Sequence, residues 1–131
     1  MIERLRRRIA TGERQGGFTL IELLVVIVII GVLLAIAVPS YLGFKKRAEN
    51  SAAESNLRAA IPSVEAFYSD NGFYTGMTTA LLKSTYDAGL SADVTIVSVA
   101  ADTYCVSSKH NNSDTYYRNG PGGTISTTAC T

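Results

Sequence analysis

The chain has 131 residues and nearly balanced charge, with 12 basic and 11 acidic side chains and a formal net charge of +1. This length leaves room for one small domain beside a membrane segment, and the balance excludes the strongly basic footprint of a general nucleic-acid-binding protein. The charge is unevenly distributed along the chain. Residues 1–17 carry five arginines against two glutamates, whereas the remaining residues include seven basic and nine acidic side chains.

The first 17 residues, MIERLRRRIATGERQGG, are polar and basic and have no apolar face long enough to pack. Basic residues beside a membrane segment favour its cytoplasmic side, so we expect the chain after that segment to lie outside. Arg6-Arg7-Arg8 has the look of a twin-arginine export signal, but the segment that follows it is too apolar for that interpretation.

The stretch from Phe18 to Val38, FTLIELLVVIVIIGVLLAIAV, is almost wholly apolar and carries one ionisable side chain, Glu22. As a helix it would be about 32 Å long, which is enough to cross the roughly 30 Å of a bilayer core. A carboxylate inside such a segment is costly and therefore marks a candidate functional residue. The alternative is a tolerated acid whose side chain reaches toward the lipid headgroups.

Two cleavage sites are compatible with this layout. Ala35-Ile36-Ala37 follows the apolar run in the manner of an ordinary signal peptide. That run is longer than a usual signal-peptide core, however, and it contains Glu22. Cleavage there would also leave Pro39 near the new N-terminus and discard the most distinctive part of the chain. We favour a cut between Gly17 and Phe18, and glycine there agrees with it, since it has no side chain to obstruct a protease. The alternative for Gly17 is a flexible hinge, and cleavage would place the Phe18 amine about one helical turn from Glu22.

The helical pattern continues beyond Pro39 with an apolar stripe at Leu57, Ile61, Val64 and Tyr68. Asp70-Asn71-Gly72 is typical of a helix stop, so we expect one helix from about Thr19 to Ser69. Pro39 and Pro62 each lack a backbone donor and are expected to bend or loosen it.

A basic segment, Lys45–Arg47, lies just past the apolar run. We interpret it as a solvated helix surface. The alternative is that it pairs with acidic residues of neighbouring subunits in a polymer.

The last third of the chain reads as short strands. Residues 70–92 have little periodicity and are interpreted as a connection with one helical turn at Ala80–Lys83. Four strand-like runs follow, separated by turn signals: Val94–Ala100, Thr103–Ser108, Thr115–Tyr117 and Thr124–Thr127. The predicted fold class is therefore α+β, a long helix packed on a small antiparallel sheet.

The two cysteines, Cys105 and Cys130, both fall in the part expected outside the membrane. An even pair in an exported region favours a disulfide over two free thiols. In a sheet this small the bond would matter, because closing a loop of about 25 residues stabilises a fold by roughly 3 kcal/mol.

Motifs for chemistry are missing from the sequence. His110 is the single histidine and is interpreted as part of a solvated loop, so we expect no catalytic residues, no metal site and no cofactor. Asn111-Asn112-Ser113 fits a glycosylation sequon, but such short patterns are frequent by chance.

The stretch Gly17-Phe18-Thr19-Leu20-Ile21-Glu22-Leu23, with the apolar run behind it, resembles the processing site of type IV pilins. The resemblance is close from Gly17 to about Tyr41, including Pro39, and extends over the rest only in layout. In that family a prepilin peptidase cuts after a glycine that ends a basic leader, and the new N-terminal phenylalanine is N-methylated. The resemblance implies that Gly17 ends the leader, that Phe18 is the methylated terminus and that Glu22 acts in assembly. The leader here is longer than many in the family.

The resemblance also implies the organisation of the chain: a cleaved leader at 1–17, a transmembrane half-helix at 18–38, an amphipathic half-helix at 39–69 and a sheet domain at 70–131. The implied fold is type IV pilin-like, and many pilins pin their C-terminal region with a disulfide such as Cys105–Cys130.

The implied function is structural: a single-pass precursor in the cytoplasmic membrane is processed and becomes part of an extracellular pilus. The implied partners are other copies in a helical filament, the prepilin peptidase and the assembly machinery, with no nucleic-acid contact required. The alternatives are a pseudopilin of a type II secretion or DNA-uptake system and a membrane-anchored binding domain that never polymerises. Motility and adhesion are not distinguished by the sequence.

Overall fold

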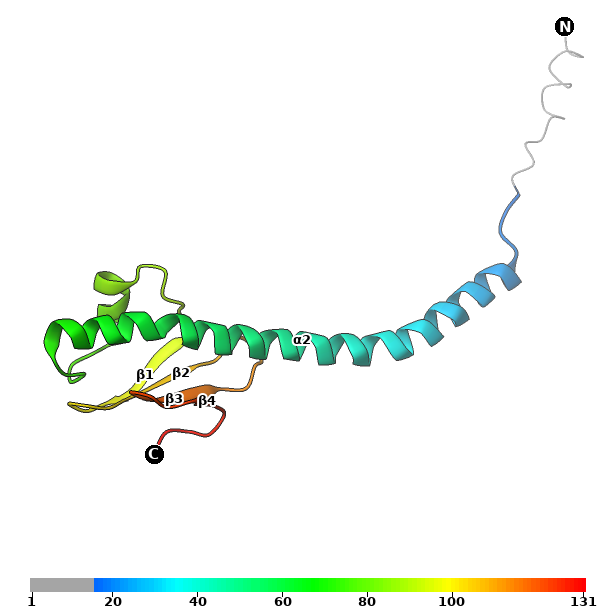
Figure 1. Cartoon of the computed structure of the whole chain (residues 1–131). Coiled ribbons are helices and arrows are strands. Elements are labelled where there is room, and N and C mark those ends of the chain that lie inside the picture. Colours follow the sequence, from blue (N-terminus) through cyan, green and yellow to red (C-terminus); the bar gives the residue numbers. More distant parts are fainter. Residues whose placement is uncertain (1–15) are drawn as a thin grey trace, which may run out of the picture. The chain divides into compact units, whose positions relative to one another are not determined.

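The computed structural model describes residues 16–131, so the part of the predicted leader at 1–15 lies outside the described residues. The chain divides into two units, Met1–Ser40 and Tyr41–Thr131. The elements in chain order are α2 (Leu20–Asn71), α3 (Thr79–Leu81), η1 (Leu82–Tyr86), β1 (Val94–Val99), β2 (Tyr104–Ser108), β3 (Tyr116–Gly120) and β4 (Ile125–Ser126) (Figure 1). The predicted α+β class is confirmed.

Helix α2 is close to its predicted bounds and is continuous through Pro39 and Pro62, so neither proline ends it. It stops at Asn71 because Gly72 adopts a positive φ of 77°, a conformation that glycine reaches without steric cost. The Gly72 amide donates to the carbonyl oxygen of Tyr68 at 2.7 Å and satisfies one of the carbonyls left unpaired at the helix end.

The first half of α2 has no protein partner among the described residues. Its large apolar side chains from Leu20 to Val38 are all between 46% and 82% exposed. Of the described helices, α2 is the one long and apolar enough to cross a membrane by length and composition. A continuous apolar surface of this kind needs lipid or other protein around it.

In the second unit, one face of α2 forms half of the core. The predicted stripe is right at Leu57 and Val64, which are fully buried, but Ile61 and Tyr68 only flank the core. The buried residues of α2 are Glu49, Ala53, Leu57, Ala60, Ser63, Val64 and Phe67. Counting large apolar residues missed Ala53 and Ala60, which are both fully buried.

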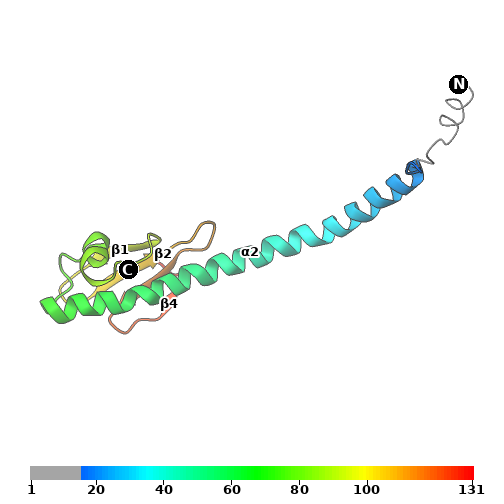
Figure 2. The ribbon, with the colours of Figure 1, turned by 90° about the horizontal axis from the view of Figure 1, so that it is seen from above.

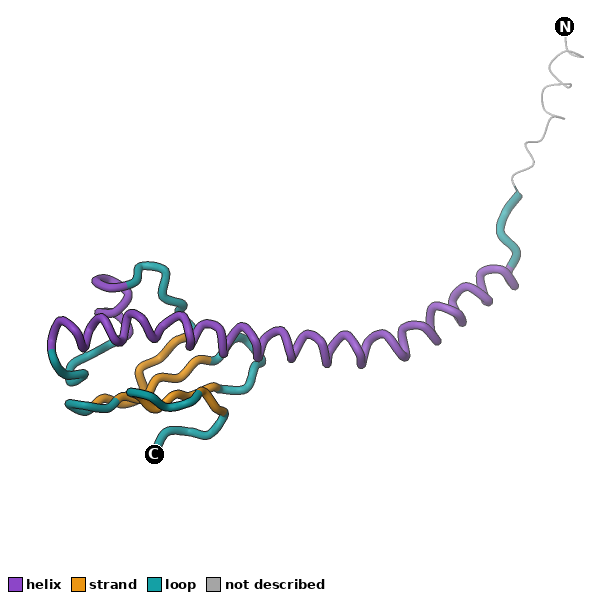
Figure 3. The backbone as a smooth tube through the Cα atoms, viewed as in Figure 1, coloured by secondary structure: helices purple, strands orange, loops and turns teal. Residues whose placement is uncertain are grey.

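The sheet has the sequential order β1-β2-β3-β4 with antiparallel neighbours. It lies along the second half of α2, and the chain after β4 lies on the sheet face turned away from the helix (Figures 1 and 2). Figure 3 shows the short loops that join consecutive strands. Three predicted strands match their elements within about two residues, whereas β3 runs on to Gly120, further than the predicted Thr115–Tyr117.

A cluster of tyrosines around Glu65 closes the core at the far end of α2. The phenols of Tyr74 and Tyr104 both donate to the Glu65 carboxylate. Tyr74 donates to Oε2 at 3.2 Å, and Tyr104 donates to Oε1 at 3.2 Å. Gly120 lies opposite Tyr104 in the sheet, and a Cβ on Gly120 would collide with the Tyr104 ring. Glycine at this position therefore leaves the space that Tyr104 needs to reach Glu65.

This cluster predicts a loss of stability at alkaline pH. Burial, with the Glu65 carboxylate beside the ring, raises the pKa of Tyr74 to about 12, and burial also raises the pKa of Tyr104 to about 12. Between pH 10 and 12 the folded state therefore holds protons that the unfolded state has lost, so stability falls as pH rises through this range. Tyrosinate absorbance of the detergent-solubilised chain should show two late-titrating phenols, and the Tyr74→Phe/Tyr104→Phe variant should lack them. Two equally late phenols in that variant would contradict the assignment.

Candidate functional site

The residues around the predicted cleavage site lie in irregular backbone before α2. Residues 16–19 have no regular secondary structure, and Gly17 is exposed. No heavy atom lies within 4 Å of the position that a Cβ on Gly17 would occupy. A protease thus meets an extended, unobstructed peptide on the N-terminal side of the helix.

Glu22 is bonded to the N-terminus of its own helix. The Thr19 amide and the Thr19 hydroxyl donate to Glu22 Oε2 at 2.8 and 2.9 Å, and the Glu22 amide donates back to the Thr19 hydroxyl at 3.2 Å. This reciprocal arrangement is a capping box, in which a threonine and a glutamate three residues later satisfy amides that the helix leaves unpaired. Sequence reasoning weighed Glu22 as a membrane carboxylate and as an assembly residue, although the pattern Thr-x-x-Glu before an apolar run would also have identified the cap.

The cap also aims the carboxylate at the predicted new terminus. Glu22 reaches the amide of Thr19, which directly follows Phe18. The Phe18 side chain is 92% exposed and contributes nothing to a core in the described chain. Cleavage after Gly17 would thus create a cationic amine at Phe18, which directly precedes the Thr19 amide that donates to the Glu22 carboxylate.

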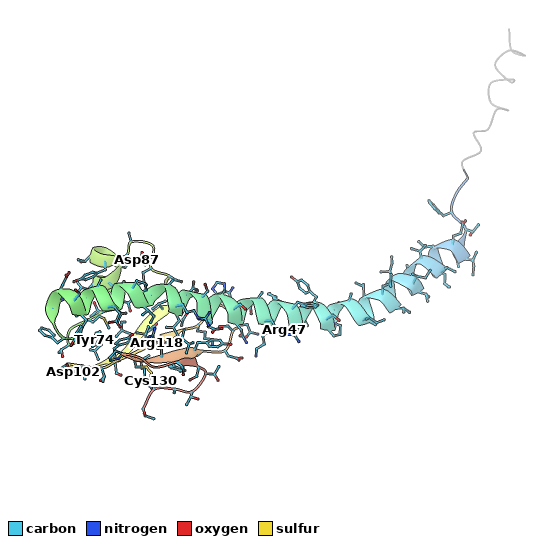
Figure 4. All side chains as sticks on the ribbon, viewed as in Figure 1. Arg47, Tyr74, Asp87, Asp102, Arg118 and Cys130 are labelled. Atoms are coloured by element: carbon cyan, nitrogen blue, oxygen red, sulfur yellow. A yellow bond between two sulfur atoms is a disulfide. The ribbon has the colours of Figure 1, made fainter. Side chains whose placement is uncertain are left out.

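In the second unit the predicted disulfide is confirmed, since Cys105 is bonded to Cys130 with a Cα–Cα distance of 6.1 Å. Tyr104 and Val106 face the core, so strand alternation places Cys105 between them on the opposite face of β2. The bond holds the segment after β4 against that outer face, where Cys130 is labelled in Figure 4.

Loss of this bond should destabilise the second unit. The Cys130→Ser change removes a cross-link across about 25 residues, which is worth roughly 3 kcal/mol and about 10 to 20 °C in the melting temperature of a domain this size. Near-ultraviolet circular dichroism follows the packed tyrosines during melting of the detergent-solubilised chain. The reduced wild-type protein is the control and should melt with the variant. Equal melting of the oxidised wild type and the variant would contradict a stabilising role.

Comparison with known proteins supplies the remaining evidence. Residues 13–38 match the family model described as the prokaryotic N-terminal methylation motif. The major component of the type IV wide pilus of Thermus thermophilus, PilA4, is 39% identical over 107 residues, which cover 77% of this chain and 78% of that protein. The chain belongs to the type IV pilin family.

Other relatives of this pilin match over shorter lengths. The type IV major pilin protein PilA of Myxococcus xanthus is 44% identical over 62 residues, 47% of this chain and 28% of that protein. The type II secretion system core protein G of Pectobacterium carotovorum is 41% identical over 64 residues, 49% of this chain and 41% of that protein. The chain spans less than half the length of each of these two relatives.

The pilin's β2–β3 loop docks on α2 through polar contacts that sequence reasoning did not foresee. Asp114 accepts a salt bridge from Lys46 at 3.1 Å and a hydrogen bond from the Asn50 amide at 3.1 Å. Lys46 is the main cause that lowers the pKa of the Asp114 carboxyl. One member of the exposed basic segment is thus already paired within its own chain.

His110 is also engaged, and the interpretation as part of a solvated loop is incomplete. Its Nδ1 lies 2.6 Å from Asp93 Oδ2, and the Asn56 amide donates to the same oxygen at 3.1 Å. The nearby Ser113 hydroxyl donates to the Asp114 carbonyl oxygen at 2.8 Å, so it is directed at the backbone and not at the imidazole ring. These contacts join the loop, the start of β1 and the helix.

Proposed function

We propose that this pilin is a structural subunit of a type IV pilus, made as a membrane precursor and assembled into a surface filament. Its leader, residues 1–17, is removed by a prepilin peptidase after Gly17, and Phe18 becomes the N-methylated terminus. Residues 18–38 anchor the precursor in the cytoplasmic membrane and then form the filament core, residues 39–69 carry the sheet, and residues 70–131 form the filament surface.

The observation that carries this proposal is the uncovered apolar half of α2, which directly follows an accessible cleavage motif and a helix cap. In a lone anchor this carboxylate serves only to cap its own helix. In a polymer that carboxylate has a partner, because the cleaved Phe18 amine of a neighbouring copy needs a counter-charge when both are withdrawn from water. Repetition of such a head-to-tail contact generates an open helical filament.

The pseudopilin alternative has its own support in the match to protein G. The matches to PilA of 62 residues and to protein G of 64 residues can lie almost entirely within the N-terminal motif and α2. The match to PilA4 covers 77% of the chain, so it must extend past Asn71 into the sheet domain. Protein G of Vibrio cholerae also matches past Asn71, with 37% identity over 63% of this chain. The pilus subunit is favoured because the match to PilA4 is longer, with 39% identity over 77% of this chain.

The test is microscopy of material sheared from producing cells, combined with N-terminal mass analysis of the chain in it. We expect filaments that contain a chain starting at N-methylated Phe18. Retention of the chain only as an intact membrane monomer would support the non-polymerising alternative. A terminus at Val38 would show that an ordinary signal peptidase processes it.

A further inference from the structure

Charge is segregated within the second unit. Between Arg58 and Lys109 the chain has five acidic residues and one basic residue, Lys83. Tyr41 to Arg58, by contrast, contains four basic and two acidic residues. The first unit contributes nothing to this contrast, because Glu22 is the one charged residue from Phe18 to Ser40.

Two carboxylates gather at the far end of α2, and we call them the acidic end: Asp70 and Asp102. Asp70 lies in the last turn of α2, and Asp102 lies in the β1–β2 turn. This turn is held beside the helix end by the Tyr74 amide, which donates to the Ala101 carbonyl oxygen at 2.9 Å. Both carboxylates are exposed, and no ion pair involves either of them among residues 16–131.

The position of Asp70 is unfavourable within a single chain. The C-terminus of a helix carries partial negative charge and favours cations, yet the last turn of α2 contains no basic residue. The contact found for the Asp70 carboxylate is with the Tyr86 phenol, whose pKa it raises together with burial of the ring. Asp102 adds a second negative charge beside the same helix end. The acidic end thus has negative potential that its own chain does not neutralise.

The opposite end of the second unit has unpaired positive charge. Of the basic segment Lys45–Arg47, Lys46 is bonded to Asp114, whereas Lys45 and Arg47 form no ion pair in the described chain. The Arg47 guanidinium lies 5.9 Å from the centre of the Phe44 ring and is exposed. Figure 4 shows Arg47 at one end of this unit and Asp102 with Tyr74 at the other.

We propose that the basic segment of one copy contacts the acidic end of a second copy, as a contact additional to the one between Glu22 and Phe18. The inference rests on the proposed function, because copies inserted in one membrane orientation and stacked in one polymer present unlike ends to each other. Arg47 and Asp70 are 23 residues apart on one helix, or about 35 Å along its axis. The two copies that meet are therefore displaced by about this distance.

Zero-length carbodiimide cross-linking of purified filaments tests the contact, since the reagent joins lysine amines to carboxylates that touch. We expect peptides that link Lys45 or Lys46 to Asp70 or Asp102. Such links must join two copies, because Asp70 is about 35 Å from the basic segment along α2, and Asp102 lies at the end of the unit away from Arg47 (Figure 4). The link between Lys46 and Asp114, at 3.1 Å within the chain, is the internal control. Filaments that yield only the control link overturn this contact and leave the proposed function intact, whereas absence of wild-type filaments overturns the proposed function itself.

Charge reversal gives a second test. Arg47→Glu and Asp102→Lys alone should each lower the amount of sheared filament by about five-fold or more at low salt, and the double variant should recover much of it. Thr95→Glu and Thr95→Lys make matched charge changes at an exposed position on the outer face of the sheet and should leave the amount unchanged. Normal assembly of the single variants would overturn the contact, and so would a double variant that yields no more filament than either single variant.

Discussion

Replacing Glu22 with valine is expected to leave cleavage after Gly17 intact but to reduce filaments far more than ten-fold. The carboxylate and the cationic Phe18 amine are each costly to bury alone, and removal of one partner from a buried pair costs several kcal/mol because the other remains unpaired. Valine suits a bilayer better than glutamate does, so a tolerated acid would predict normal filaments. Immunoblots and microscopy of sheared material measure the outcome.

The capping box makes this experiment sharper. Glutamine at position 22 keeps a side-chain oxygen that accepts from Thr19 but loses the charge. Thr19→Val removes both hydroxyl contacts of the capping box, leaves the amide contact and keeps the charge. If Glu22 acts through charge, Glu22→Gln fails to assemble as Glu22→Val does, and Thr19→Val assembles. The reverse pattern would show that the glutamate serves only to start the helix.

The Gly17→Leu change is expected to abolish processing and therefore assembly. A leucine side chain at the last leader residue obstructs the peptidase, and the precursor should persist in the membrane with its 17-residue leader. Neither Gly17 nor Gly16 has a heavy atom within 4 Å of a potential Cβ, so leucine at either position leaves the fold undisturbed. Gly16→Leu is thus the matched control and should be cleaved. Intact mass of the membrane-bound chain decides the result, and a normally trimmed Gly17→Leu chain would contradict this cleavage site.

Much of the fold was predictable because its signals are local. The stop at Asn71-Gly72 and the turn at Gly120-Pro121 depend on residues whose backbone preferences act without tertiary help. The core face of α2 was less predictable, since its centre includes Ala53 and Ala60. A stripe built from large apolar residues does not include alanine, so it could not find these two buried positions.

The polar contacts of the second unit were beyond sequence reasoning for a different reason. Asp114 meets Lys46 and Asn50 across 64 or more residues of chain, and nothing near Asp114 in the sequence names its partner. The capping box was within reach, because Thr19 and Glu22 are three residues apart. The prediction that the chain is cut between Gly17 and Phe18 came from resemblance. The exposure of these two residues shows that a protease can reach them, but it does not show that a peptidase recognises them.

The sequential order of the sheet has a consequence for how the second unit is made. Each strand pairs with the strand that precedes it in the chain, so each pairing closes only a short loop, which favours rapid folding. The apolar face of α2 emerges first and stays uncovered until β1 and β2 follow. Cys130 comes after every strand, and its partner lies on the central strand β2. The disulfide therefore closes last, on a sheet that has already formed. If oxidation fails, late folding intermediates should persist and be open to proteolysis.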